Sequence, residues 1–249
     1  MPVPIELSIL LPTFHDGEES SVNGSCNFLD NFIDSLVMSL SEDPTYVELL
    51  IGQGGPNDPT ACDVMDRAVG DWDNVSLYRY GKKINSSKIL NRLSKIASGR
   101  VLVKCNADIE FVTPSWAEKL LDEFDNAPSN VGILGTNQIG IGDASTTESC
   151  GDSEFSGCFY PVRQEVFKEI GGWNEKSESM CDFDFTLQAQ NNGWKVMNAP
   201  EIEFISRKHY RKDLNAPEPN QETGGISAQS QQSTDTKRGT KVEEGTPHG

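Results

Sequence analysis

An apolar run leads directly into polar residues at positions 100–110, Arg100-Val-Leu-Val-Lys-Cys-Asn-Ala-Asp-Ile-Glu110. The run 100–105 indicates a buried β-strand. Asn106 and Asp108 follow two residues apart, so their side chains are expected on the same side of the chain. An amide oxygen and a carboxylate are hard ligands that suit Mg²⁺ or Mn²⁺. The alternative is a turn in which both side chains hydrogen-bond to their own backbone.

Strand-like and helical segments alternate on the N-terminal side of this stretch. Strands are expected at 6–11, 46–51 and 75–80, and helices with one apolar face at 28–40, 58–68 and 86–97, the last capped by Ser86 or Ser87. A further helix opens at Thr113-Pro114. This alternation predicts βαβ units, and therefore an α/β fold with a mostly parallel sheet covered by helices on both faces. Ligands bind beyond the carboxyl ends of such strands, which here are residues 12–16, 52–58 and 106–110.

The second half of the chain has weaker periodicity. Strands are expected at 131–135, 155–162 and 195–198, and a short helix at 163–170. Residues 182–189 alternate like a strand, although their surroundings suit a helix. We expect one folded domain over 1–212. Residues 213–249 contain few apolar residues and no aromatic one, which predicts a disordered tail.

Charge and cysteine content limit the classes of partner and location. The 249 residues include 21 Lys and Arg against 38 Asp and Glu, a net charge of −17. This excess argues against nucleic acid or an anionic membrane as the main partner. Neither a signal peptide nor a transmembrane run is visible, and the six cysteines form no CxxC pair. We therefore expect a cytoplasmic protein with reduced thiols.

Several standard sites are missing from the sequence. It contains no GxxxxGK[ST] phosphate loop, no GxSxG nucleophile elbow and no zinc-ligand spacing. What remains is carboxylate chemistry, at Asn106 and Asp108 and at a second acidic cluster of Asp182 and Asp184. The alternative for the second cluster is a pair of carboxylates that complement the dipole at a helix N-terminus.

Five motifs in order resemble the family 2 glycosyltransferases of the GT-A fold, over roughly residues 5–210. They are Leu7-Ser-Ile-Leu-Leu-Pro-Thr-Phe14, Asn91 followed by Ala97-Ser-Gly99, Asn106-Ala-Asp108, Gly171-Gly-Trp-Asn-Glu175 and Cys181-Asp-Phe-Asp184. The resemblance implies a nucleotide-sugar donor (a UDP-sugar is favoured) with a divalent metal, Mn²⁺ or Mg²⁺, on its diphosphate. It also implies inverting transfer to a hydroxyl of a glycan, lipid or protein.

The resemblance also assigns roles to individual residues. It places Asp182 as general base, Trp173 and Asp184 at the acceptor, and Asp108, Asn106 and His209 at the metal. The residues that it implies at the donor are Pro12, Thr13, Phe14, Gln53, Asp58, Asn91 and Ala107.

Two other functions compete with this interpretation. Gln53, Gly54 and Asn106 stand where the family's motifs carry carboxylates, which favours a non-catalytic module that binds a nucleotide sugar or glycan. A nucleotidyltransferase ranks last, because residues 15–19 after the first strand are acidic rather than basic and glycine-rich.

Overall fold

The central sheet of the computed structural model has eight strands, of which four neighbours along one side run parallel. The structure describes residues 3–13, 25–40, 44–55, 66, 72–139, 148–150, 153–176 and 181–206. Phe14, Asp58, His209 and the segment 213–249 lie outside these residues. The strands, in sheet order, are β3 (Val75–Arg79), β2 (Val47–Gln53), β1 (Leu7–Thr13), β4 (Val101–Cys105), β9 (Phe159–Arg163), β6 (Val131–Ile139), β10 (Lys195–Ser206) and β5 (Ile109–Phe111).

Strand directions divide the sheet into two parts. Parallel pairing joins β3, β2, β1 and β4, whereas β9 is antiparallel to both β4 and β6. Strand β10 runs parallel to β6 and antiparallel to the edge strand β5. A separate hairpin pairs β7 (Glu148–Cys150) with β8 (Ser153–Phe155).

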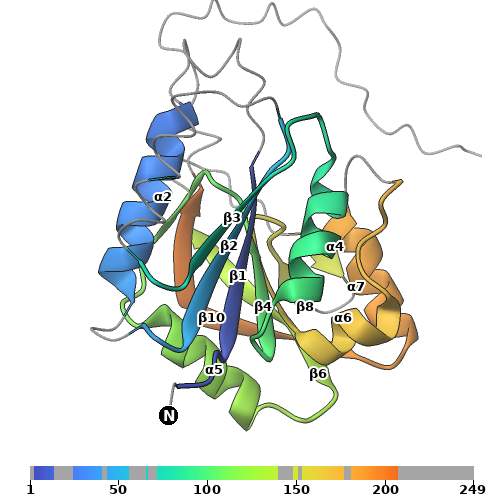
Figure 1. Cartoon of the computed structure of the whole chain (residues 1–249). Coiled ribbons are helices and arrows are strands. Elements are labelled where there is room, and N and C mark those ends of the chain that lie inside the picture. The colour runs from blue at the N-terminus through green and yellow to red at the C-terminus, as the bar shows by residue number, and fades with distance from the viewer. Residues whose placement is uncertain are drawn as a thin grey trace, which may run out of the picture. The chain divides into compact units, whose positions relative to one another are not determined.

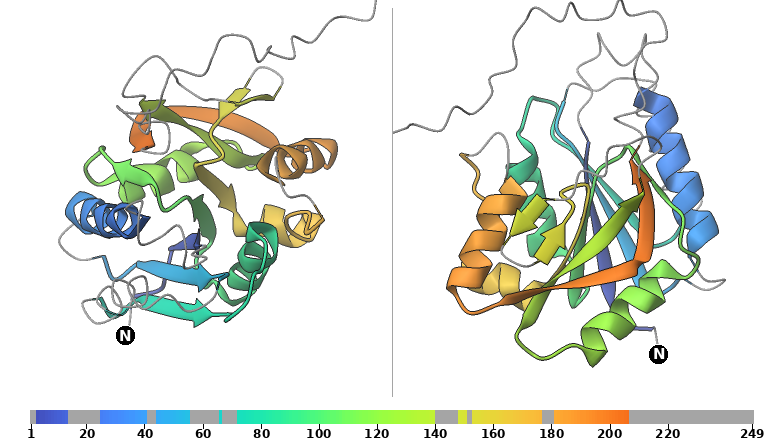
Figure 2. Two further views of the ribbon diagram at one scale, coloured as in Figure 1. Left: turned by 90° about the horizontal axis from the view of Figure 1, so that it is seen from above. Right: turned by 180° about the vertical axis from the view of Figure 1, so that it is seen from behind.

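Helices cover both faces of the sheet (Figures 1 and 2). On one face lie α2 (Ser25–Ser39) and α5 (Trp116–Asn126), and on the other α4 (Ser86–Ile96), α6 (Gln164–Ile170) and α7 (Cys181–Asn191). Within the described residues, no helix is long and apolar enough to cross a membrane.

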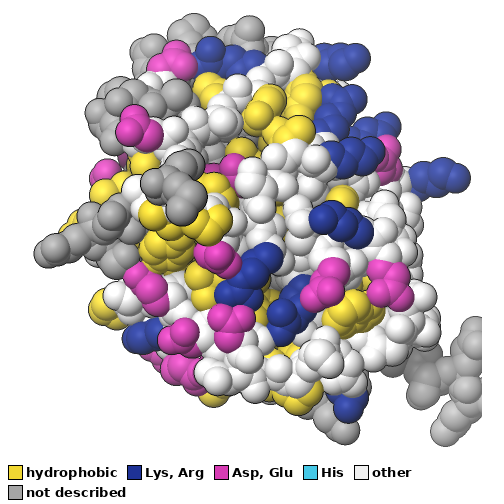
Figure 3. Space-filling view, turned by 60° about the horizontal axis from the view of Figure 1, so that its bottom comes forward, with side chains coloured by type: hydrophobic (Ala, Val, Ile, Leu, Met, Phe, Trp, Pro, Cys, Tyr) yellow, Lys and Arg dark blue, Asp and Glu magenta, His cyan; other side chains and the backbone are white. Residues whose placement is uncertain are grey.

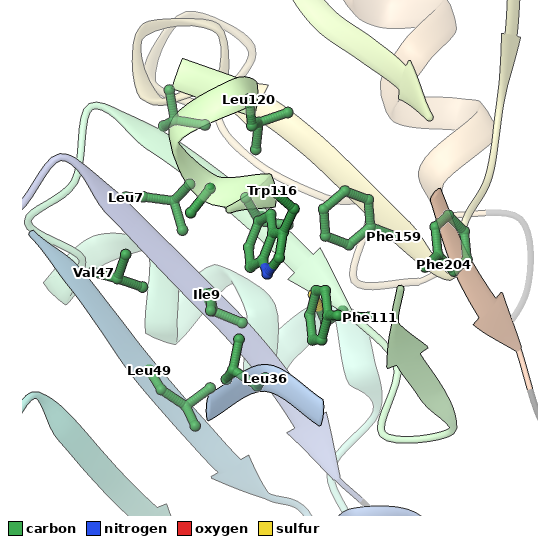
Figure 4. Packing of buried hydrophobic residues seen from close by; sticks show 14 of the residues in the cluster. Leu7, Ile9, Leu36, Val47, Leu49, Phe111, Trp116, Leu120, Phe159 and Phe204 are labelled. Atoms are coloured by element: carbon green, nitrogen blue, oxygen red, sulfur yellow. The ribbon is translucent and has the colours of Figure 1, made fainter. Parts of the chain in front are cut away.

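The two-sided cover explains why the strands read as continuous apolar runs. Along β1, Leu7 and Ile9 join one core cluster and Leu10 joins the other. The first cluster centres on stacked rings, with Phe111 and Trp116 4.7 Å apart between centroids and Phe159 edge-on to both (Figure 4). Both faces of the sheet are therefore packed, and polar chemistry is left to the strand ends.

The α/β fold class and the early strands are confirmed, whereas later elements differ from expectation. The expected strand 155–162 is interrupted, because β8 ends at Phe155 and β9 begins at Phe159, and β10 extends to Ser206 instead of ending at 198. The ambiguous segment 182–189 is a helix, because the positions that it buries, Asp182, Phe185, Thr186 and Ala189, recur at three- and four-residue spacing. The cap of α4 is Asn85, one residue before the expected serines, and its side chain accepts a hydrogen bond from the backbone N–H of Lys88 at 2.9 Å. Strand β5 was not expected, since three residues carry no readable period.

Helix α4 packs directly on the backbone at the carboxyl end of β2. A Cβ atom on Gly52 would lie 2.2 Å from Cγ2 of Ile89, and one on Gly54 would lie 2.5 Å from its Cδ1. The Cβ on Gly54 would also lie 2.7 Å from the backbone oxygen of Ile84. An acidic side chain at position 54 would therefore displace α4, which gives a physical reason for the glycine there.

We expect Gly52→Ala to destabilise the fold, because its Cβ meets only side chains of α4. Overpacking of this kind costs about 1–3 kcal/mol in the free energy of unfolding, measurable by urea denaturation. Ile89→Ala alone should cost about 2–5 kcal/mol by leaving a cavity. The double variant should cost clearly less than the sum of the two, because the new methyl group enters that cavity. Additive effects would contradict the contact.

Candidate active site

A cleft of about 760 Å³ opens at the carboxyl ends of the parallel strands. Its walls come from the end of β1, the segment that follows β3, and the first turns of α4. The lining residues are Pro12, Thr13, Lys82, Lys83, Ile84, Asn85, Ser86, Lys88, Ile89 and Arg92. Four of these ten carry positive charge, although the chain as a whole carries −17. Figure 3 shows Lys and Arg side chains gathered toward the upper right of the face that it presents.

The electrostatics of the cleft suit an anionic ligand. The N-terminus of α4 contributes the positive end of a helix dipole beside the charged side chains. The guanidinium of Arg92 lies over the ring of Tyr80, 4.8 Å from its centroid. Cationic groups and backbone N–H donors together are the usual setting for phosphate binding.

The residues expected at the donor divide into two groups. Pro12 and Thr13 line the cleft, and the Thr13 hydroxyl donates to the backbone oxygen of Gly52 at 3.4 Å. Gln53 and Asn91 are buried, and Ala107 packs against the core, so these three do not form its walls.

Asn91 instead fastens the Gly-Gly-Trp loop to α4. Its side-chain amide donates to the backbone oxygen of Trp173 at 2.9 Å and to the carboxylate of Glu175 at 3.1 Å, and its Oδ1 accepts from the N–H of Trp173 at 2.8 Å. Gly172 has φ 100°, and a Cβ there would lie 2.5 Å from that Oδ1. Asn85 adds a bond to the backbone oxygen of Glu175 at 2.8 Å. One helix thus carries both the cleft wall and the anchor of this loop.

The loop positions an indole against Asp182. Trp173 is 2% exposed, and its ring stacks on Phe185 with centroids 5.0 Å apart. Its Nε1 donates to Oδ1 of Asp182 at 3.2 Å. The structure therefore places Trp173 in the core beside the expected base, while Asp184 is half-buried in the same first turn of α7. Acceptor contacts of these two residues stay predictions.

A buried ion pair joins Asp182 to the central sheet. Nζ of Lys104 lies 2.6 Å from Oδ2 of Asp182, and the two side chains are only 8% and 10% exposed. The ammonium also donates to the backbone oxygen of Gly157. Sequence reasoning missed Lys104, although one signal was present: it is the only charged residue inside the apolar run 101–105.

The expected metal motif lies in the turn between β4 and β5. Asn106 donates from its backbone to the oxygen of Cys158 at 2.9 Å and from its amide to the Cys158 sulfur at 3.4 Å, an arrangement that leaves Oδ1 for another partner. Burial, and secondarily the negative charge of Asp108, raise the pKa of the Cys158 thiol. Asp108 and Asn106 fit a divalent cation in donor type. The described part of the chain, however, contains no cluster of three His, Cys, Asp or Glu side chains that could complete a site.

Solved structures match the chain in fold. No family sequence profile matches it, and no curated protein matches it in sequence. The mannosyltransferase PcManGT from Pyrobaculum calidifontis, in complex with GDP-Man and Mn²⁺, superposes with a TM-score of 0.64 at 11% identity, over 82% of this chain and 59% of that one. Residues 1–349 of TarS from S. aureus, in complex with UDP-GlcNAc, give 0.65 at 14% identity, over 81% and 58%.

The chain has the GT-A fold. The GT-A fold expected from the ordered motifs is thereby confirmed, while membership of family 2 stays a prediction. The chain spans less than two thirds of the length of the two solved structures. In this GT-A domain, α4 connects the cationic cleft to the Gly-Gly-Trp loop. Trp173 in turn connects that loop to Asp182.

We expect Asn91→Ala to loosen the loop and destabilise the protein. It leaves the buried N–H and C=O of Trp173 without their partner, which costs about 1–3 kcal/mol in unfolding free energy by urea denaturation. Asn126→Ala is the matched control, since this exposed asparagine makes a single bond to the backbone oxygen of Asp122. Its effect should stay within about 0.5 kcal/mol. Equal effects of the two variants would contradict the anchoring role.

Proposed function

We propose that the chain is a glycosyltransferase that moves a sugar from a nucleotide-sugar donor to an acceptor hydroxyl. The observation that carries this proposal is the cationic cleft between the carboxyl end of β1, the segment that follows β3 and the first turns of α4, in a GT-A fold. The two solved structures of this fold contain GDP-Man and UDP-GlcNAc. Both ligands are nucleoside diphosphate sugars, and a UDP-sugar is the donor that we favour.

The cleft is proposed to hold the donor. The side chains of Lys82, Lys83, Lys88 and Arg92 would compensate the charge of the diphosphate, and Pro12 and Thr13 would line the nucleoside. Loss of the leaving nucleoside diphosphate concentrates negative charge on its oxygens. Fixed cations near that charge lower the barrier to departure.

Asp108 and Oδ1 of Asn106 are proposed to hold Mn²⁺ or Mg²⁺, with His209 as a further ligand. When bound, the cation supplies Lewis-acid stabilisation of the diphosphate. The support is the oxygen chemistry of these side chains and the Mn²⁺ in the PcManGT complex. Because Asn106 replaces a carboxylate, the affinity for metal should be lower than that of a site with two carboxylates.

Asp182 is proposed as the general base. It would accept the proton of the attacking hydroxyl while the acceptor oxygen bonds to the anomeric carbon and the bond to the diphosphate breaks. Attack opposite the leaving group inverts the configuration at that carbon. The acceptor would be a glycan, a lipid or a protein.

One observation favours the alternative of a module that binds the donor without transfer. Both oxygens of Asp182 already contact protein groups, Oδ2 the ammonium of Lys104 and Oδ1 the indole of Trp173. Each carboxylate oxygen has a second lone pair, so a hydroxyl can still be accepted. The enzyme and the binding module are therefore distinguished by activity rather than by donor affinity.

The donor site is tested by calorimetry with UDP-, GDP-, dTDP- and CMP-sugars, each with and without Mn²⁺. We expect one class to bind, more tightly with Mn²⁺, and Asp108→Asn to remove the effect of the metal. Lys88→Met should weaken binding about tenfold, the cost of losing one charge-assisted contact. Lys95→Met, in the last turn of the same helix and outside the cleft, should bind like wild type. Equal loss in both variants would move the donor away from the cleft.

The base is tested by comparing Asp182→Asn with Asp184→Asn in a transfer assay. Asp182→Asn should keep donor affinity, because a base acts on the acceptor, and should lower the rate of transfer by about 10²–10⁴. Asp184→Asn, which changes the half-buried carboxylate two residues away, should retain most activity. A wild type that binds the donor yet transfers to no acceptor would favour the binding module. An inactive Asp184→Asn beside an active Asp182→Asn would reassign the base.

A further inference from the structure

Lys104 occupies a position where a lysine is costly. All five residues of β4 are buried, and the charged end of this side chain points into the layer between the sheet and α7. Transfer of an ammonium and a carboxylate out of water costs more than a well-packed apolar pair in the same space, so a buried ion pair is weak evidence for stability. A lysine at this position therefore calls for an explanation other than the stability of the core.

The contacts of the pair fix one carboxylate from three elements. Lys104 in β4 holds Oδ2 of Asp182, and Trp173 in the Gly-Gly-Trp loop holds Oδ1. Gly157, in the turn before β9, lies so close that a Cβ there would be 2.9 Å from Oδ2. The hydroxyl of Thr186 donates to the backbone oxygen of Asp182 at 2.8 Å and contacts the Tyr160 hydroxyl at 2.7 Å. These contacts therefore fix both the rotamer and the backbone position of Asp182.

The same strand also carries the expected metal motif. Asn106 and Asp108 follow Lys104 by two and four residues, in the turn into which β4 leads. One strand thus leads into the expected metal ligands and, two residues before Asn106, contacts the expected base through Lys104. The distance between the base and the donor is then set by the sheet rather than by a loop.

We infer that Lys104 is a positioning residue, which aims the carboxylate of Asp182 at the acceptor hydroxyl and supplies the positive charge beside it. This inference rests on the proposed function, because it assigns Asp182 to proton transfer. Two thiols, those of Cys105 and Cys158, interact electrostatically with Lys104, and burial raises the pKa of both. Lys104 is thus the nearest cation to the carboxylate among the described residues.

The experiment compares Lys104→Met, Lys104→Arg and Lys104→Met/Asp182→Asn, with the donor found by calorimetry and its acceptor. Lys104→Met should lower kcat about tenfold or more, with donor KM within about twofold. Lys104→Arg should recover part of kcat. The double variant should be no slower than Asp182→Asn alone, because Lys104 acts through that carboxylate.

The controls separate positioning from folding. Lys168→Met removes an exposed lysine whose hydrogen bond among the described residues is to Gln164 of its own helix, and it should leave kcat and KM unchanged. If Lys104→Met does not fold, Trp173→Phe tests the same idea from the other oxygen, because it keeps an aromatic ring and removes Nε1 together with the rest of the five-membered ring. It should lower kcat without changing donor KM.

Each remaining outcome decides against a specific claim. A Lys104→Met variant with the kcat of wild type, or rate losses that multiply in the double variant, would overturn the inference and leave the proposed function standing. A wild type without transfer would overturn the proposed function, and the inference with it. A lower melting temperature of Lys104→Met with unchanged kcat would assign the pair to folding alone.

Discussion

The close approach of α4 to the glycine backbone at the end of β2 determines where the cationic cleft wall and the Gly-Gly-Trp loop lie. Gly52 and Gly54 leave room for Ile89, so the helix sits within contact of the strand ends. Its first turns then form the cationic wall of the cleft, and Asn91 in its middle holds the loop that carries Trp173. A side chain at either glycine would displace the donor wall and the indole together, because one rigid helix carries both.

Much of the fold could be predicted from the sequence, because strands covered on both faces and helices with one apolar stripe have distinct periods. The strand ends at Thr13 and Asn106 were therefore found. Side-chain direction was harder to predict: nothing in the sequence says that Gln53 and Asn91 face inward, since both are polar residues near a strand end or in a helix. Lys104 escaped notice because one lysine hardly disturbs an apolar run. Its partner is 78 residues away in the chain, and only the tertiary fold brings them together.

The charge distribution allows the cleft to attract an anionic ligand before the ligand touches the protein. An acidic surface repels anions over most of the molecule, whereas the lysines and the arginine around the N-terminus of α4 attract them. Such a field concentrates an anionic ligand at one opening and weakens as salt screens it. Acidity that argues against a nucleic-acid partner is thus compatible with a phosphorylated small molecule, provided that the positive charge is local.

The contact between the Lys104 ammonium and the backbone oxygen of Gly157 determines which of the two positions must carry the base. A salt bridge between two side chains alone can exchange its partners during evolution, with acid and base trading places. Here the exchange would set a carboxylate against a carbonyl oxygen, two acceptors without a proton between them. Descendants of this chain can keep the pair, replace Lys104 by arginine or lose both residues together. They cannot exchange the acidic and the basic residue. A backbone atom, which no substitution can change, therefore restricts the substitutions open to two side chains.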